Sequence, residues 1–403
     1  MLFLYFVFVI ISIFFSRKYM YNSIINPISI YGMVWFVAFF FHECGIVYYY
    51  KISWNTFFCI VVAHCCFIIG AMLGVKISKF QFIKYKKEHE NVRRQLKYNI
   101  LIISCVSGVG IIRNFINTLL NYGIGLKINY KSLYQDNVSQ ALESSFSLSS
   151  LLYVAVSLTG IYIVKYGYEK CLLLPVVLMI ISGLSSGSRG SFIIQILLFV
   201  SSISLISIEH NKEQKTNIRG VKFLFIIMTI IVFIITLSRG SGNTSADNKN
   251  ILVRFVVGYM ASGIGCLDQY LMAPDVVGYP QYLFRVPFIV FNKLGITSVD
   301  TRYHINTYFI PDSSNVITYI GELYHDFGEL YFIPIVFMSV MFSDSYCRAK
   351  RTGTIFSYVM YSSFFTVFCL SFFANFIHVA SIWYVILFGG TIAFFVDKVK
   401  LKL

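Results

Sequence analysis

Long apolar runs follow one another along almost the whole of this 403-residue chain, and they limit what it can fold into. A helix of about 20 apolar residues crosses the hydrocarbon core of a bilayer, where every backbone N–H and C=O group must be bonded internally. The composition agrees, because 57% of the residues are hydrophobic and only 13% are charged, against roughly 25% charged residues in a soluble domain. The sequence therefore predicts an all-α, polytopic integral membrane protein.

We predict about eleven transmembrane helices within a single transmembrane domain covering residues 1–403. The first is interpreted as a retained span rather than a signal peptide, because residues 1–15 lack a basic region and a small-residue cleavage site. The predicted spans are Leu2–Phe15, Ile25–Phe41, Trp54–Val75, Tyr98–Leu120, Leu148–Val164, Cys171–Leu184, Phe192–Ile208, Val221–Leu237, Asp326–Phe342, Thr354–Phe373 and Ser381–Val396.

The basic residues of the short loops predict the orientation. With Lys76–Lys97 in the cytoplasm, strict alternation puts 22 of the 33 basic and 7 of the 18 acidic residues inside, a surplus equal to the whole net charge of +15. The N-terminus is then outside and the C-terminus inside. The charge is explained by topology and by anionic membrane lipid, without a nucleic-acid partner.

On this topology residues 239–325 form one long outer loop between the eighth and ninth spans. Within it Ile251–Met272 is apolar but interrupted by Arg254 and Asp268, which suits a re-entrant or interfacial helix. A smaller outer loop, Asn121–Phe146, is rich in Tyr, Ser, Asn and Gln. Such residues suit sugar surfaces, although we favour ordinary membrane-interface composition here.

The tetrapeptide Ser-Arg-Gly-Ser occurs twice beside apolar runs, at residues 188–191 and 238–241. An arginine there suggests a functional site, although Arg189 alone could be a turn residue that snorkels toward lipid phosphate. Arg113 lies beside Asn114 inside the fourth span, so we expect it to face the protein interior. Guanidinium groups bind phosphate oxygens in bidentate fashion. The arginines of the outer level therefore predict binding of a phosphorylated lipid headgroup: Arg113, Arg189, Arg239, Arg254, Arg285 and Arg302.

Of three carboxylates near the ninth span, Asp326 is the preferred candidate for a general base and Glu322 the next, whereas Glu329, a turn deeper, is interpreted as structural. If Tyr319–Glu329 is helical, Glu322, Asp326 and Glu329 share one face. Their mutual repulsion and partial desolvation would raise a carboxyl pKa toward the range of a general base, whereas the alternative is that they cap the positive end of a helix. His304, in the upstream segment that begins at Asp300, is a further candidate.

Several kinds of chemistry lack a motif in this sequence. It contains no P-loop, dinucleotide glycine fingerprint, Asp-x-Asp pair or metal-ligand cluster, so we predict neither a cofactor nor a metal. The nine cysteines lie mostly in apolar runs and do not suggest a disulfide framework. His64 and His378, in or beside spans, are interpreted as structural.

Three segments resemble the bacterial oligosaccharide repeat-unit polymerases, the O-antigen polymerase family. They are LSSGSRGS at residues 184–191, YMASGIGCLDQYL at residues 259–271 and GELYHDFG at residues 321–328, which leads into a span. The order of these segments, the many spans and the late outer loop all agree with that family.

The resemblance implies a metal-independent glycosyltransferase at the outer face of the bacterial plasma membrane. Donor and acceptor would both be polyprenyl-diphosphate-linked oligosaccharides, the product an O-antigen or capsular-type polysaccharide, and the partners a chain-length regulator and a flippase. The diphosphate would meet arginines, which stabilise the charge that develops on the leaving group. The base would be Asp326, Glu322 or His304, and Ser188, Gly190, Asp268 and Asp300 would belong to the substrate loops.

Two alternatives remain at this stage. The related O-antigen ligases carry a histidine–asparagine pair before a comparable late span, whereas this chain reads Ser313-Ser314-Asn315 there, which favours a polymerase. A flippase or other transporter would place ionisable residues near the middle of the bilayer. In this chain the central spans are nearly free of charge, which favours an enzyme with a site at one membrane face.

Overall fold

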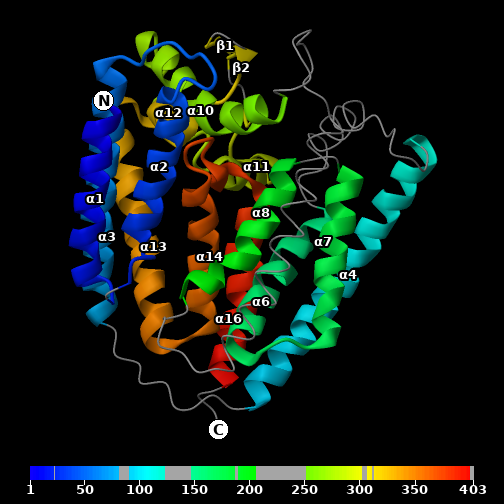
Figure 1. Cartoon of the computed structure of the whole chain (residues 1–403). Coiled ribbons are helices and arrows are strands. Elements are labelled where there is room, and N and C mark those ends of the chain that lie inside the picture. The colour runs from blue at the N-terminus through cyan, green and yellow to red at the C-terminus, as the bar shows by residue number, and fades with distance from the viewer. Residues whose placement is uncertain are drawn as a thin grey trace. The chain divides into compact units, whose positions relative to one another are not determined.

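The computed structural model describes residues 1–21, 23–80, 90–122, 147–186, 189–205, 251–301, 306–310 and 313–399. Helices make up most of this part of the chain (Figure 1). The chain divides into two compact units. Unit 1 consists of Met1–Phe82, Ser245–Arg348 and Phe364–Val379, and unit 2 consists of Ile83–Thr244, Ala349–Ser363 and Ala380–Leu403.

Unit 1 contains the first three helices and the candidate outer-loop elements. Its elements are α1 (Leu2–Tyr19), α2 (Pro27–Glu43), α3 (Trp54–Phe80), α10 (Ile251–Met272), α11 (Arg285–Lys293), β1 (Tyr308–Phe309), β2 (Ser313–Ser314), α12 (Thr318–Phe327), the 3₁₀ turn η5 (Gly328–Tyr331), most of α13 (Phe332–Thr352) and the 3₁₀ turn η6 (Phe376–His378). The strands β1 and β2 pair antiparallel, with Tyr308 opposite Ser314.

Unit 2 is built around α4, which packs on α6 and α7. Its elements are α4 (Glu90–Tyr122), η1 (Leu148–Ser150), α6 (Leu151–Tyr166), η2 (Lys170–Leu172), α7 (Leu173–Ser186), α8 (Arg189–Val200), η3 (Ser201–Leu205), α15 (Ala380–Tyr384), the π-helical turn η7 (Val385–Gly389) and α16 (Gly390–Val399). Helix α14 (Ile355–Cys369) begins in unit 2 and ends in unit 1.

Six helical segments of the described residues are long and apolar enough to cross a membrane, which supports an all-α membrane protein. These segments are Leu2–Tyr19, Trp54–Lys79, Glu90–Leu120, Leu148–Tyr166, Thr318–Thr352 and Ala380–Lys398. Four shorter apolar helices coincide with the predicted second, sixth, seventh and tenth spans. The predicted eighth span, Val221–Leu237, lies outside the described residues, and the total of eleven spans stays a prediction.

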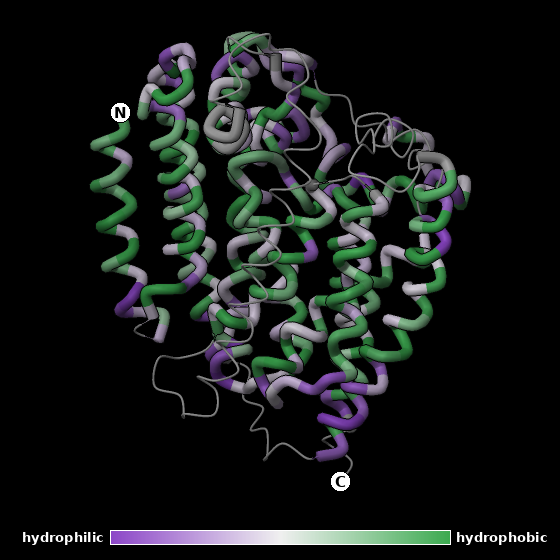
Figure 2. Tube along the Cα trace, turned by 45° about the vertical axis from the view of Figure 1, so that its right-hand side comes forward, coloured by the Kyte–Doolittle hydropathy of each residue, from purple (hydrophilic) through white to green (hydrophobic). Residues whose placement is uncertain are grey.

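The surface of these helices is suited to lipid. Large apolar side chains are exposed on them, for example Val109 (69% exposed) on α4 and Phe337 (64%) on α13. Figure 2 shows hydrophobic residues along most of the length of the helices, with hydrophilic residues gathered toward their ends. This is the distribution that a hydrocarbon environment requires, because a polar group in lipid must find an internal partner.

Local sequence explains where individual helices begin and how closely they pack. Asn26 caps α2 by accepting a hydrogen bond from Ser29 N at 3.1 Å, and Pro27 occupies the first helical position. In α3, Gly70 and Gly74 lie against the backbone of α13, where a Cβ atom on Gly74 would be 2.5 Å from the Val340 carbonyl oxygen. Small residues four apart allow two membrane helices to approach this closely.

One further prediction is confirmed in this part of the chain. The interrupted apolar stretch Ile251–Met272 is helical over those bounds, as α10. All nine cysteines are free thiols in the structure.

Candidate functional site

The candidate site lies in unit 1, where α12 carries two carboxylates that are completely buried. Glu322 and Asp326 are both 0% exposed. They lie four residues apart and therefore on one face of the helix, as predicted. A buried carboxylate is stable only when hydrogen-bond donors or a cation compensate for its lost hydration. The partners of each carboxylate therefore define its chemistry.

Glu322 pairs with a histidine from a distant part of the chain. Its Oε2 lies 3.1 Å from Nδ1 of His378, which ends the turn η6. Asn375 holds this turn, because its side-chain oxygen accepts a hydrogen bond from Ile377 N at 3.4 Å. The His378 side chain is 10% exposed whereas that of Glu322 is fully buried. A carboxylate that accepts from Nδ1–H fixes the imidazole tautomer and makes Nε2 the basic nitrogen.

Asp326 is bonded mainly to backbone. Its two carboxylate oxygens each accept from Tyr282 N at 3.0 Å, and Oδ2 also accepts from Leu283 N at 2.8 Å. His325 Nδ1 is 3.5 Å from Oδ1, and the His325 ring stacks on Tyr282 with ring centroids 4.5 Å apart. Because backbone amides occupy its oxygens, the geometry suits Asp326 as an anchor for the segment before α11 better than as a proton acceptor.

The third predicted carboxylate does not share the face of the other two. Helix α12 ends at Phe327 because Gly328 has a φ of +56°, and Glu329 falls in the following 3₁₀ turn. Glu329 is exposed and accepts a hydrogen bond from Tyr324 OH. The predicted stripe of three carboxylates is therefore wrong, since a glycine in the left-handed region redirects the chain between the second and third.

Two segments singled out in the sequence, residues 259–271 and 321–328, pack against each other. A Cβ atom on Gly321 of α12 would lie 3.2 Å from Leu267 of α10, and one on Gly263 of α10 would lie 3.0 Å from Thr318 Cγ2. Thr318 has a φ of +60°, an unusual value for a β-branched residue, at the start of α12. The small residues of these segments thus allow α10 and α12 to come together beside the Glu322–His378 pair.

Asp268, predicted as a substrate-loop residue, lies in α10 and bonds to the start of α3. Its Oδ1 accepts from Ser53 N at 2.8 Å, from Ser53 Oγ at 2.7 Å and from Thr56 Oγ1 at 2.7 Å. These three donors belong to the first turn of α3 and the residue before it. Asp268 therefore fastens α10 to α3.

Comparison with protein-family models, curated proteins and solved structures finds no match to this chain.

The predicted diphosphate-binding arginines are divided between the two units. Arg189 is the first residue of α8 in unit 2, and Arg254 lies in the first turn of α10 in unit 1. Arg113 is exposed on α4, so the prediction that it faces the protein interior is wrong. The rotation of a long apolar helix about its own axis decides which of its sides contacts other helices, and the sequence does not determine this rotation.

The positions of the remaining predicted site residues do not indicate a role for them. Gly190 is in the first turn of α8, where a Cβ atom would meet nothing within 4 Å. Asp300 is exposed, and its backbone carbonyl accepts from Gln281 Nε2 at 2.6 Å. The predicted site residues outside the described part of the chain are Ser188, Arg239, Arg302 and His304.

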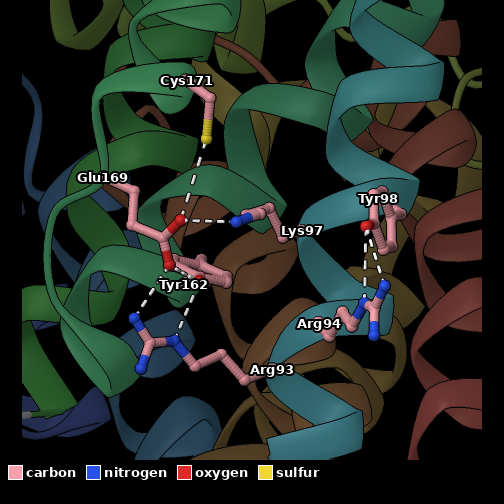
Figure 3. Close-up of polar contacts among 7 residues, drawn as sticks. All are labelled: Arg93, Arg94, Lys97, Tyr98, Tyr162, Glu169 and Cys171. Atoms are coloured by element: carbon pink, nitrogen blue, oxygen red, sulfur yellow. Dashed lines mark hydrogen bonds and ion pairs between the residues drawn. The ribbon is translucent and has the colours of Figure 1, made fainter.

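A second polar cluster, in unit 2, holds the loop between α6 and α7 against α4 (Figure 3). Glu169 accepts from Arg93 at 2.9 Å, from Lys97 at 2.8 Å and from Tyr162. The hydrogen bond from Lys97, followed by those from Tyr162 and Arg93, lowers the pKa of the Glu169 carboxyl to about 2. Sequence reasoning missed this cluster, because nothing in the local pattern distinguishes Glu169 from an ordinary loop residue.

No group of three or more His, Cys, Asp or Glu side chains within the described ranges is arranged to hold a metal ion. His64 is buried in α3 with its Nδ1 3.2 Å from Tyr5 OH, which agrees with a structural role. His378 is different, since its pairing with Glu322 makes it a candidate functional residue that the sequence interpretation set aside. Only the fold brings residue 378 to residue 322.

Proposed function

We propose that this chain is a membrane glycosyltransferase that joins polyprenyl-diphosphate-linked oligosaccharide repeat units into a polysaccharide at the outer face of the bacterial plasma membrane. The Glu322–His378 pair carries the proposal, because glycosyl transfer needs a group that accepts a proton from a hydroxyl nucleophile. The close packing of α10 on α12, the two helices whose sequences resemble the polymerase family, supports it.

In the proposed reaction a sugar hydroxyl of the acceptor attacks the anomeric carbon of the donor. The new C–O bond forms as the bond between that carbon and the diphosphate oxygen breaks, and polyprenyl diphosphate leaves with the electron pair. The hydroxyl proton passes to Nε2 of His378, while Glu322 stabilises the resulting imidazolium through Nδ1–H. A buried carboxylate suits this purpose because its attraction to the imidazolium is weakly screened.

The arginines are proposed to bind the diphosphate. An arginine supplies a permanently charged, bidentate donor for an oxyanion whose charge grows as the bond breaks, and Arg254 is the member of the predicted set that the structure describes in the same unit as the Glu322–His378 pair. Arg113 is a weaker member of this set because its side chain is exposed on α4. No step requires a metal, and the proposed partners are the lipid-linked substrates, a flippase that delivers them and a chain-length regulator.

The test measures the chain length of the polysaccharide on gels, where it runs as a ladder of repeat units. The cells lack the chromosomal gene for this protein and express a variant instead. His378→Ala and Glu322→Gln should each reduce polymerisation by about 10² to 10⁴, the usual contribution of a general base, leaving single repeat units. Glu329→Gln is the matched control, because this carboxylate is exposed and should be dispensable. Asp326→Asn should reduce the amount of folded protein in the membrane, and the polymer should fall only in proportion.

Membrane abundance is measured for every variant. Full-length ladders from both His378→Ala and Glu322→Gln at normal abundance would show that the pair is not the base. A deletion strain that still makes its full polymer would contradict the polymerase proposal itself.

A further inference from the structure

The segment between α10 and α12 that carries α11, residues 281–301, is bonded to itself. We call it the α11 segment. The Asn292 side chain closes its turn, donating to the Val299 carbonyl at 2.6 Å and accepting from Val299 N at 3.1 Å and Thr297 Oγ1 at 2.7 Å. At its ends Arg285 Nε donates to the Thr301 carbonyl at 2.8 Å. These bonds give the segment a defined shape without a core of its own.

The α11 segment is fixed to the end of α12. Asp326 accepts from the backbone of Tyr282 and Leu283, and Val277 N donates to the His325 carbonyl at 2.9 Å just upstream. The segment and the C-terminal turn of α12 therefore lie at the same level of unit 1.

That level corresponds to one surface of the bilayer. The candidate membrane segment Thr318–Thr352 contains α12 and α13, and Asp344, Arg348 and Arg351 mark its far end. At 1.5 Å per residue helix α13 rises about 18 Å from Phe332 to Asp344, and η5 and α12 lie beyond its N-terminal end within the same candidate membrane segment. We therefore infer that the end of α12 and the attached α11 segment lie toward the membrane surface opposite Asp344.

Several apolar side chains of the α11 segment are exposed, whereas Tyr282 and Leu283 at its start are buried. No residue of α11 is buried, and the exposed side chains in and beside it include Phe284 (42%), Phe291 (41%), Leu294 (66%) and Ile296 (65%). Phe284 and Phe291 lie seven residues apart and so share one helix face. Arg285 and Lys293 place a positive charge at each end of α11. Exposed apolar side chains with cationic neighbours are typical of a helix that lies in the membrane interface.

We propose that the α11 segment is a membrane-surface anchor, in which Phe284, Phe291, Leu294 and Ile296 insert into the interfacial layer of a phospholipid bilayer. Arg285 and Lys293 add attraction to anionic headgroups, because cations near such a surface are drawn to it. The anchor fixes the depth of the chain between α10 and α12 in the membrane. It also holds the backbone of Tyr282 and Leu283 in place to donate hydrogen bonds to Asp326. It depends on membrane insertion alone and is independent of the glycosyltransferase proposal.

The test is site-specific photo-cross-linking in nanodiscs of phosphatidylethanolamine and phosphatidylglycerol. The photoreactive p-benzoylphenylalanine replaces Phe291 or Leu294, and the adducts are identified by intact-protein mass spectrometry. Phe337, exposed on α13, is the lipid-facing reference, and the exposed Ser298 is the polar control within the same segment. All four positions are exposed, and a single size-exclusion peak confirms that each variant is folded.

We expect phospholipid adducts at positions 291 and 294 in yields comparable with position 337 and about 10-fold above position 298, because acyl chains reach the inserted side chains. Yields at 291 and 294 no greater than at 298 would mean that the segment faces water. Adducts of two protein chains without lipid at 291 and 294 would show that a second copy covers the surface. Either result overturns the proposal.

Discussion

At the scale of single residues, the hydrogen-bond partners distinguish the two buried carboxylates of α12. Glu322 and Asp326 are neighbours on one helix face and equally buried, yet one pairs with an imidazole and the other with backbone amides. The first arrangement is the one that we propose to accept a proton. In the second, backbone N–H groups of Tyr282 and Leu283 hold the carboxylate and tie two chain segments together.

Glu169 allows a prediction about pH. Hydrogen bonds from Lys97, Tyr162 and Arg93 lower the pKa of its carboxyl from 4.5 to about 2, so ionised Glu169 is favoured in the folded state. Its stabilising contribution is complete well above pH 4.5 and is lost as the pH falls from 4.5 toward 2. We expect the thermal unfolding midpoint to be higher for the wild type than for Glu169→Gln at pH 7, with the difference shrinking below pH 4.5.

The measurement is thermal unfolding of purified protein in detergent at a series of pH values. Glu43→Gln is unsuitable as a control, because a hydrogen bond with His42 also lowers the pKa of Glu43. Glu329→Gln is the control variant, since that carboxylate is exposed and accepts a hydrogen bond from Tyr324 OH rather than from a cation. A constant difference between wild type and Glu169→Gln across the whole pH range would refute the assignment.

At the scale of elements, backbone-to-backbone approach determines which helices pair. Gly70 and Gly74 bring α3 against the carbonyl groups of α13, and Gly160 does the same for α6 against the Phe199 carbonyl of α8. Between membrane helices such contact replaces the hydrophobic driving force, because lipid tails are as apolar as leucine.

A substitution at this contact should be costly. In Gly74→Ala the new methyl group would meet the Val340 carbonyl oxygen at 2.5 Å, where only a shift of backbone can make room. We expect a loss of about 1–3 kcal/mol in the free energy of unfolding, as for other overpacked interiors. Thermal unfolding in detergent or steric-trap measurements in bilayers would report it.

The matched control is Gly258→Ala in α10, where the nearest atom to a new Cβ is Tyr49 OH at 3.9 Å. Alanine favours a helix over glycine by up to about 1 kcal/mol, so this variant should be neutral or more stable. Equal stability of the Gly74→Ala and Gly258→Ala proteins would contradict the proposed packing.

At the scale of the whole molecule, the prediction concerns orientation. Strict alternation of spans puts the surplus of positive charge inside, with residues 76–97 cytoplasmic and residues 239–325 outside. Single cysteines at positions 85 and 245 of a cysteine-free chain can be labelled with an impermeant reagent on intact spheroplasts. We expect labelling at position 245 alone, and labelling at position 85 alone would reverse the topology.

Much of the helical layout follows directly from the sequence. Ten predicted spans coincide with apolar helices, and α10 has the bounds expected from its sequence. Helices in lipid must satisfy their own backbone, so a continuous apolar run is sufficient to predict one. The i, i+4 spacing of Glu322 and Asp326 was readable for the same reason, since it depends on one helix only.

The tertiary structure decided what these residues contact. It pairs Glu322 with His378, and it places the Asp326 carboxylate where it accepts hydrogen bonds from the backbone of Tyr282 and Leu283. The chain turns at Gly328, so Glu329 does not lie on the helix face that Glu322 and Asp326 share. It also leaves Arg113 exposed on α4. Each of these outcomes depends on how a helix is rotated and which distant segment it meets. Local periodicity determines neither, because an almost uniformly apolar helix has no sequence-encoded inner face.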